Sequence, residues 1–143
     1  MVIKCGKRYN GFQQDQLETE RRNLKNYLQN IDVGMTKESY YEMCEQLGTD
    51  PESGDIPVDY DDLTNQTQLA LYAFELLPDS WDSMNGTYLG KSFNILEFVL
   101  EHLVSNKSSW LTVTMLLLYI ISIRVEGVNK KMKQKAKMQA KKK

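Results

Sequence analysis

The fold is decided by residues 64–104, where two apolar segments flank a polar loop. The first segment reads TNQTQLALYAFELL (64–77), the loop PDSWDSMNGTYLGK (78–91) and the second segment SFNILEFVLEHLV (92–104). Both segments carry apolar residues at helical spacing, so each predicts a helix with a buried face. The loop is then held between two rigid supports, which is a common position for recognition residues.

Local signals set the limits of these two helices. Thr64 or Asn65 begins the first one, and Pro78 ends it near Leu77, because the residue before a proline avoids helical angles. Its apolar surface is so wide that we expect it to be buried on most sides; the residues are Leu69, Ala70, Leu71, Tyr72, Ala73, Phe74, Leu76 and Leu77. The second helix aligns four large residues and ends near residues 105–106; they are Phe93, Leu96, Leu100 and Leu103.

Upstream, the pattern predicts two more helices. Residues 1–12 are mixed in character and predict an extended arm, and residues 13–29 predict a helix with a thin apolar stripe. Residues 30–34 interrupt that pattern. A short helix then follows the N-cap Thr36 and stops at Gly48, with an apolar face formed by Tyr40, Met43, Cys44 and Leu47.

An acidic linker follows at residues 49–62, with six acids in fourteen residues. It lacks the Asp-x-Asp-x-Asp-Gly order of a calcium-binding EF-hand loop. We therefore expect a solvated linker that touches the core through Ile56 and Val58.

The last helix combines an apolar block with a basic end. Ser108 or Ser109 is the expected cap, and residues 110–123 (WLTVTMLLLYIISI) carry no charge. These 14 residues span about 21 Å as a helix, against about 30 Å for the hydrocarbon core of a bilayer. A buried core helix is therefore favoured, and a membrane span is the alternative. The helix continues into residues 129–143, which hold eight lysines and no acid, whereas residues 1–128 hold 10 basic and 19 acidic residues.

These elements predict an all-α protein, a small irregular bundle of about five helices. We expect an arm (1–12), one helical domain (13–128) and a lysine-rich tail (129–143). The two cysteines, Cys5 and Cys44, are too few for a disulfide framework and match no metal-site spacing, so reduced thiols are expected. Residues 1–10 lack the apolar region of a secretory signal.

No motif predicts catalysis, a cofactor or a metal. The run GTYLGKS (86–92) resembles the phosphate-binding G-x-x-x-x-G-K-[ST] loop but has only three residues between its glycines and follows a helix. A tight turn with Lys91 on the surface is the favoured interpretation. His102 is the only histidine, and we expect it to be a packed or hydrogen-bonded helix residue. The sequence therefore predicts a protein that is not an enzyme.

Two groups of residues are candidates for binding. The loop holds large apolar side chains that either fold back into the core or form a contact anchor, with Lys91 beside them; they are Trp81, Met84, Tyr88 and Leu89. The tail is an electrostatic candidate whose contact with nucleic acid or a membrane would be sequence-blind. Its residues are Lys130, Lys131, Lys133, Lys135, Lys137, Lys141, Lys142 and Lys143.

A resemblance adds a biological setting. The run IDVGMTKESYYEMCEQLGTDP (31–51) resembles small helical proteins encoded by tailed bacteriophages, and so does the later order of acidic linker, GTYLGK loop and lysine-rich end. The resemblance implies tail morphogenesis in the host cytoplasm or the virion. The implied role is a chaperone that binds apolar segments of other phage structural proteins, such as a tape-measure-like helical protein, or alternatively a virion subunit of tail, baseplate or neck. A homo-oligomer is compatible with both.

The uninterrupted apolar block at residues 110–123 departs from the more mixed final helix expected for such proteins. It keeps open a third class, a membrane-active protein of the holin type with the lysines on the inside.

Overall fold

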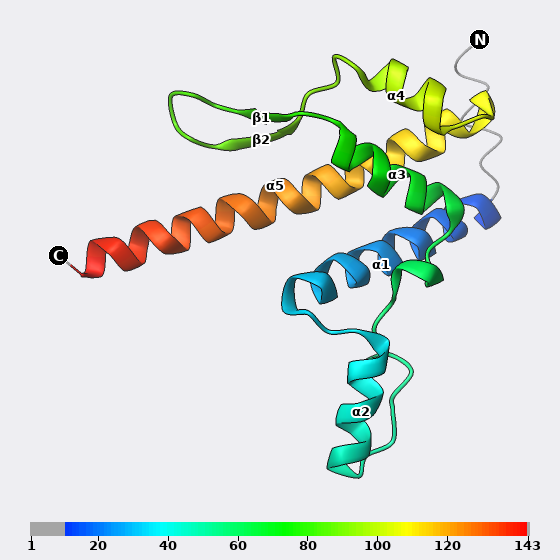
Figure 1. Ribbon diagram of the computed structural model, residues 1–143, viewed down its shortest axis with the longest axis vertical. Coiled ribbons are helices and arrows are strands. Elements are labelled where there is room, and N and C mark those ends of the chain that lie inside the picture. The colour runs from blue at the N-terminus through cyan, green and yellow to red at the C-terminus, as the bar shows by residue number, and fades with distance from the viewer. Residues whose placement is uncertain (1–10, 143) are drawn as a thin grey trace. The chain divides into compact units, whose positions relative to one another are not determined.

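The computed structural model describes residues 11–142, and it confirms a mostly α-helical protein (Figure 1). That range contains five α-helices and one two-stranded antiparallel sheet. The chain divides into two compact units, one ending at Asn65 and the other beginning at Gln66. The sequence had predicted a single helical domain across this boundary.

The first unit begins with α1 (Gly11–Val33), which is longer than predicted at both ends. Residues 11 and 12 belong to the helix and not to an arm; the rest of the predicted arm lies outside the described residues. The helix also continues past residue 30, because the first left-handed position is Gly34, with φ +70°. There, the N–H of Met35 donates to the carbonyl of Asn30 at 2.9 Å and closes the helix end.

The next helix, α2 (Lys37–Leu47), has the predicted ends and a different buried face. The Thr36 hydroxyl accepts the N–H of Ser39 at 3.1 Å, and Gly48 takes φ +67°. Of the predicted apolar face only Cys44 is buried, whereas Met43 and Leu47 are exposed. The spacing of apolar residues therefore predicted the ends of the helix correctly, but only a narrow face of the helix is buried.

The acidic linker is more ordered than a solvated connection. Its end forms a 3-10 turn, η2 (Tyr60–Asp62), and the N–H of Val58 donates to Asn26 Oδ1 of α1 at 3.0 Å. Asp59 accepts the backbone N–H of Lys37 at 3.2 Å, and Asp62 forms an ion pair with the Lys37 ammonium at 2.5 Å. Two of the six acids therefore tie the linker to the start of α2.

The boundary between the two units falls at the start of α3 (Asn65–Leu76), which begins and ends as predicted. Its buried face is narrow, consisting of Thr67, Ala70 and Ala73 with Leu77 just beyond the helix. The expectation of a helix buried on most sides was wrong, because Tyr72 and Leu76 are about half exposed. The small alanines mark the face that lies against other elements.

After residues 78–91, the chain forms α4 (Leu96–Leu103), the turn η3 (Lys107–Ser109) and α5 (Trp110–Lys141). The second apolar helix starts later than predicted, so Phe93 lies outside it. Ser109 stands at the expected N-cap position of α5. The Ser109 side chain makes no capping bond, and instead Asn106 Oδ1 accepts the N–H of Ser108 at 3.1 Å, one turn earlier.

The long basic C-terminal helix is confirmed, since α5 is continuous to Lys141. Its apolar half buries one face completely, formed by Val113, Leu116, Leu117 and Ile120. Leu111 and Leu118 are exposed on another side of the same half. The apolar block is thus a core helix along one face only.

Candidate functional site: the hairpin between α3 and α4

The predicted loop at residues 78–91 is a β-hairpin. Its strands β1 (Asp79–Trp81) and β2 (Tyr88–Lys91) run antiparallel (Figure 1). The register places Asp79 opposite Lys91. The register shifts between Ser80 and Trp81, so Trp81 pairs with Tyr88 and Leu89 is left over at a bulge. Backbone bonds close both ends, from Ser92 to Pro78 and from Asp82 to Thr87, each 2.8 Å long.

Asp82 organises the tip of the hairpin. Its carboxylate accepts the N–H of Met84 at 3.0 Å and the side-chain amide of Asn85 at 2.9 Å. These hydrogen bonds hold the pKa of Asp82 below its usual value. Gly86, with φ +67°, completes the turn and donates its N–H to the Asp82 carbonyl. This carboxylate is therefore occupied in holding the turn.

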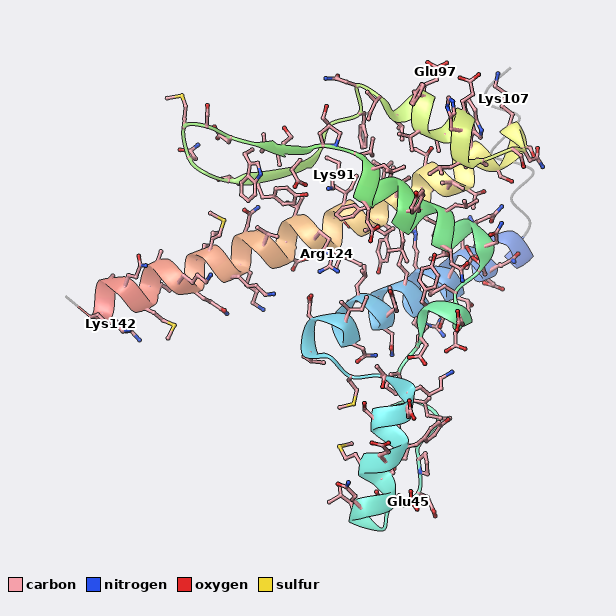
Figure 2. The ribbon with its side chains drawn as sticks, viewed as in Figure 1. Glu45, Lys91, Glu97, Lys107, Arg124 and Lys142 are labelled. Carbon is pink, nitrogen blue, oxygen red and sulfur yellow. The ribbon has the colours of Figure 1, made fainter. Side chains whose placement is uncertain are left out.

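Asp79, Tyr88 and Lys91 form a cluster at the base of the hairpin. The Asp79 carboxylate accepts the Lys91 ammonium at 2.9 Å and the Tyr88 hydroxyl at 2.7 Å. The Lys91 ammonium also lies 4.4 Å from the centre of the Phe74 ring of α3. The Lys91 side chain is only 9% exposed, so the prediction of a surface lysine was wrong. Figure 2 labels Lys91 at the base of the hairpin, beside α3.

The cluster shifts the ionisation of its members. The Lys91 ammonium and then the Tyr88 hydroxyl lower the pKa of Asp79 by stabilising its ionised form. Burial, and the hydrogen bond to Asp79, raise the pKa of the Tyr88 phenol well above its usual value. At neutral pH the cluster is therefore an ionised carboxylate between an ammonium and a neutral phenol.

The hairpin is fixed to α5 at two positions. Gly90, with φ +102°, lies so close to the helix that an added Cβ would meet Ile121 Cγ2 at 2.7 Å and Val125 Cγ2 at 3.3 Å. Further along, the Asn129 amide pairs with the backbone of Tyr88: it accepts the N–H at 3.0 Å and donates to the carbonyl at 3.1 Å. Asn129 thus satisfies this edge of β2 as a neighbouring strand would.

With the hairpin attached to α5 in this way, three of its large apolar side chains are exposed to solvent. Met84 at the tip is 91% exposed, Leu89 56% and Trp81 50%, whereas Tyr88 is only 5% exposed. Trp81 keeps its orientation by packing on Tyr88, with ring centres 4.7 Å apart. The sequence offered two alternatives for these loop side chains, burial in the core or exposure as a contact anchor, and different residues follow different alternatives. Tyr88 folds back, and the other three form the exposed surface, which we call the hairpin apolar surface.

The remaining candidates have structural explanations. In the GTYLGKS run, Gly90 is buried against α5 and Lys91 is engaged by Asp79, so the backbone and the lysine are not arranged to hold phosphate. His102 Nδ1 lies 2.8 Å from the Phe98 carbonyl, and its ring packs on the Phe98 ring. Among the described residues, no three His, Cys, Asp or Glu side chains are grouped as a metal site.

Sequence reasoning missed Asn129 and Phe74 as members of this site. Asn129 lies in α5 between the apolar block and the lysines, and no local pattern indicates that its amide meets a strand residue 41 positions earlier. Phe74 was expected to be an ordinary core residue. Only the hairpin register brings Lys91 over its ring.

Comparison with known proteins finds no matching family model, no matching curated protein and no matching solved structure.

Two glycines of the hairpin give a matched test of its attachment to α5. Both have positive φ, but a Cβ at Gly86 meets open space and a Cβ at Gly90 meets Ile121. We expect Gly86→Ala to cost about 1 kcal/mol from backbone strain alone. Gly90→Ala should cost about 2–4 kcal/mol, because overpacking is added to the strain. Urea unfolding measures both values, and equal costs would contradict the close approach.

The Asp79 cluster predicts an acid-dependent loss of stability. Because the folded-state pKa is lowered, the contribution of Asp79 is complete above its ordinary pKa and is lost as the pH falls through the lower folded value. We expect wild type to be more stable than Asp79→Asn at about pH 6, and the gap to narrow below about pH 4. Thermal unfolding across this range measures the gap. Glu97→Gln, an exposed control, should follow wild type, and a constant gap for Asp79→Asn would contradict the assignment.

Proposed function

We propose that this protein is a non-enzymatic binding protein of phage tail morphogenesis that holds apolar segments of a partner during assembly. The observation that carries the proposal is the hairpin apolar surface, Trp81, Met84 and Leu89, presented in solvent on an anchored base. The resemblance of residues 31–51 to small proteins of tailed phages supports the biological setting.

The chemistry of the surface favours binding over catalysis. Large aromatic and apolar side chains supply most of the energy at protein interfaces, and methionine adapts to partners of varied shape. The polar groups of the hairpin, Asp79, Asp82 and Lys91, are each used to hold its own structure. What remains for a partner is an apolar contact.

The chain after the hairpin extends this apolar character. Phe93, Ile95 and Phe98 are also exposed, the last at 62%. Exposed apolar side chains gathered on neighbouring segments are typical of a contact surface for another protein. A long apolar helix, such as a segment of a tape-measure-like protein, is the proposed occupant because it can contact successive side chains along its length.

Replacement of Trp81 tests this proposal. We expect Trp81→Ala to weaken co-purification with a long helical tail protein from the same gene neighbourhood by about tenfold, since central aromatic anchors contribute more than 1 kcal/mol. Glu97→Ala, an exposed substitution on α4, is the matched control and should capture as wild type does. Circular dichroism confirms that each variant is folded. Undiminished capture by Trp81→Ala would count against the hairpin as the binding surface.

A second candidate function is supported by α5. The helical stretch Lys107–Lys141 is long and apolar enough to cross a membrane by length and composition, and only 22% of its most apolar window is buried. Helix length therefore does not exclude the membrane-active class, although the uncharged block alone is short. Buried Leu117 and half-buried Ile121 favour the soluble alternative, because a lipid-facing belt would leave them bare.

Cell fractionation separates the two classes. The binding-protein proposal expects the chain in the supernatant after a high-salt wash, which removes lysine contacts to anionic lipid. Extraction that requires detergent would reject it and favour the membrane-active class. A Lys130→Gln/Lys131→Gln variant controls for electrostatic attachment, since it should change the salt requirement and not the detergent requirement.

A further inference from the structure

The C-terminal part of α5 carries positive charge without a partner. All of its described lysines are exposed, and none forms an ion pair with another described residue. Four of them, Lys130, Lys133, Lys137 and Lys141, recur at i, i+3, i+7 and i+11 and therefore line one side of the helix. Like charges at this spacing repel one another, so an anionic partner would stabilise the helix.

The first unit contains a groove suited to receive such side chains. It has a volume of about 530 Å³ and lies between the end of α1, the start of α2 and residues 58–61. The Tyr27 and Tyr60 rings line it, with centres 6.2 Å apart and tilted by 54°. Ile31 and Met35 add apolar wall, and the bond from Val58 to Asn26 fixes the linker side.

The border of this groove is acidic. Glu38 and Asp61 are exposed there and form no ion pair with another described residue. Lys37, at the start of α2, is already paired with Asp62. Residues 32–62 as a whole contain ten acidic residues and one lysine, a balance of −9. Aromatic walls with carboxylates above them are suited to an ammonium group on an aliphatic stem.

We propose that the lysine helix of one copy of this chain docks into the groove of a second copy. The stems of successive lysines would lie along Ile31 and the tyrosine rings, and their ammonium groups would meet Glu38 and Asp61. The tail balance of +8 nearly matches the −9 of residues 32–62. This inference goes beyond the proposed function and uses neither the hairpin nor its apolar surface.

Two other occupants of the lysine helix are less well matched. A nucleic acid would be repelled by the acidic residues that the same chain carries, and it offers nothing to the apolar groove. A membrane surface needs a continuous apolar stripe, but Met132 and Met138 are six residues apart and lie on different sides of the helix. The acidic groove matches both the positive charge of the lysine ammonium groups and the apolar stems of their side chains.

The proposed contact joins two different surfaces. Such a heterologous interface produces open chains of molecules, or rings where the rotation closes. Because it rests on exposed charges, it should be salt-sensitive. We therefore expect concentration-dependent assemblies at low salt that dissociate as salt is raised.

Charge reversal in trans tests the proposal by sedimentation velocity. Wild type should self-associate at about 50 mM salt, and about 500 mM salt should weaken this association about tenfold or more. Glu38→Lys/Asp61→Lys and Lys133→Glu/Lys137→Glu should each self-associate more weakly alone than wild type, because each change removes attraction and places like charges together at the contact. Mixed together, they should associate again, because the unchanged tail of the first variant meets the unchanged groove of the second, and the reversed groove meets the reversed tail.

Matched controls make the outcome decisive. Glu45→Lys/Asp50→Lys makes the same change in net charge outside the groove and should retain most of the association, as should Trp81→Ala. Circular dichroism verifies folding of every variant. A wild type that stays monomeric at low salt overturns the proposal, as does equal loss in the control or no recovery on mixing. Tight binding of duplex DNA by a monomeric wild type would instead assign the lysines to nucleic acid.

Discussion

The close approach of the hairpin to α5 is the constraint on which the second unit depends. A two-stranded hairpin is marginally stable by itself, so its order must come from packing elsewhere. Gly90 provides that packing by having no side chain where Ile121 and Val125 lie. Asn129 adds the second attachment by satisfying both backbone groups of Tyr88. With the backbone fixed at these points, the strand can present side chains to solvent without losing its shape.

The Asp79 cluster complements this attachment from the other end of the strands. Asp79 and Lys91 are paired across the register, and the Phe74 ring under the ammonium links the pair to α3. A single substitution in this group leaves a charge without its partner in a partly covered place, which costs more than an exposed ion pair contributes. The exposed Trp81 thus stands on a base whose polar groups satisfy one another, and the hairpin apolar surface is the part that stays exposed.

Local chemistry made much of the fold predictable. Thr36, Gly48 and Pro78 set helix ends through short-range rules, and the structure follows them. The remaining features of the fold could not be predicted, because they depend on contacts between residues far apart in the sequence. The hairpin register depends on a bulge at Ser80–Trp81, and without it Gly90 looks like a turn residue and Lys91 like a surface one. The apolar width of α3 suggested burial on most sides, but burial depends on how much neighbouring surface exists, and Tyr72 has too little. The sequence singled out Trp81, Met84, Tyr88 and Leu89 but left open which of them are exposed, and it did not identify the residues that hold them.

The continuity of α5 connects the two surfaces argued above. Asn129, which holds Tyr88, is followed directly by Lys130, the first lysine of the tail. An isolated helical end frays, and mutual repulsion among lysines increases fraying toward the last residue that is fixed by other contacts. That residue is Asn129. An anionic partner on the lysines would suppress fraying and so strengthen the Asn129–Tyr88 bonds, whereas a partner on the hairpin would stabilise the helix at the start of its basic part. Because both effects would act on one helix, a partner at either proposed surface would favour order at the other.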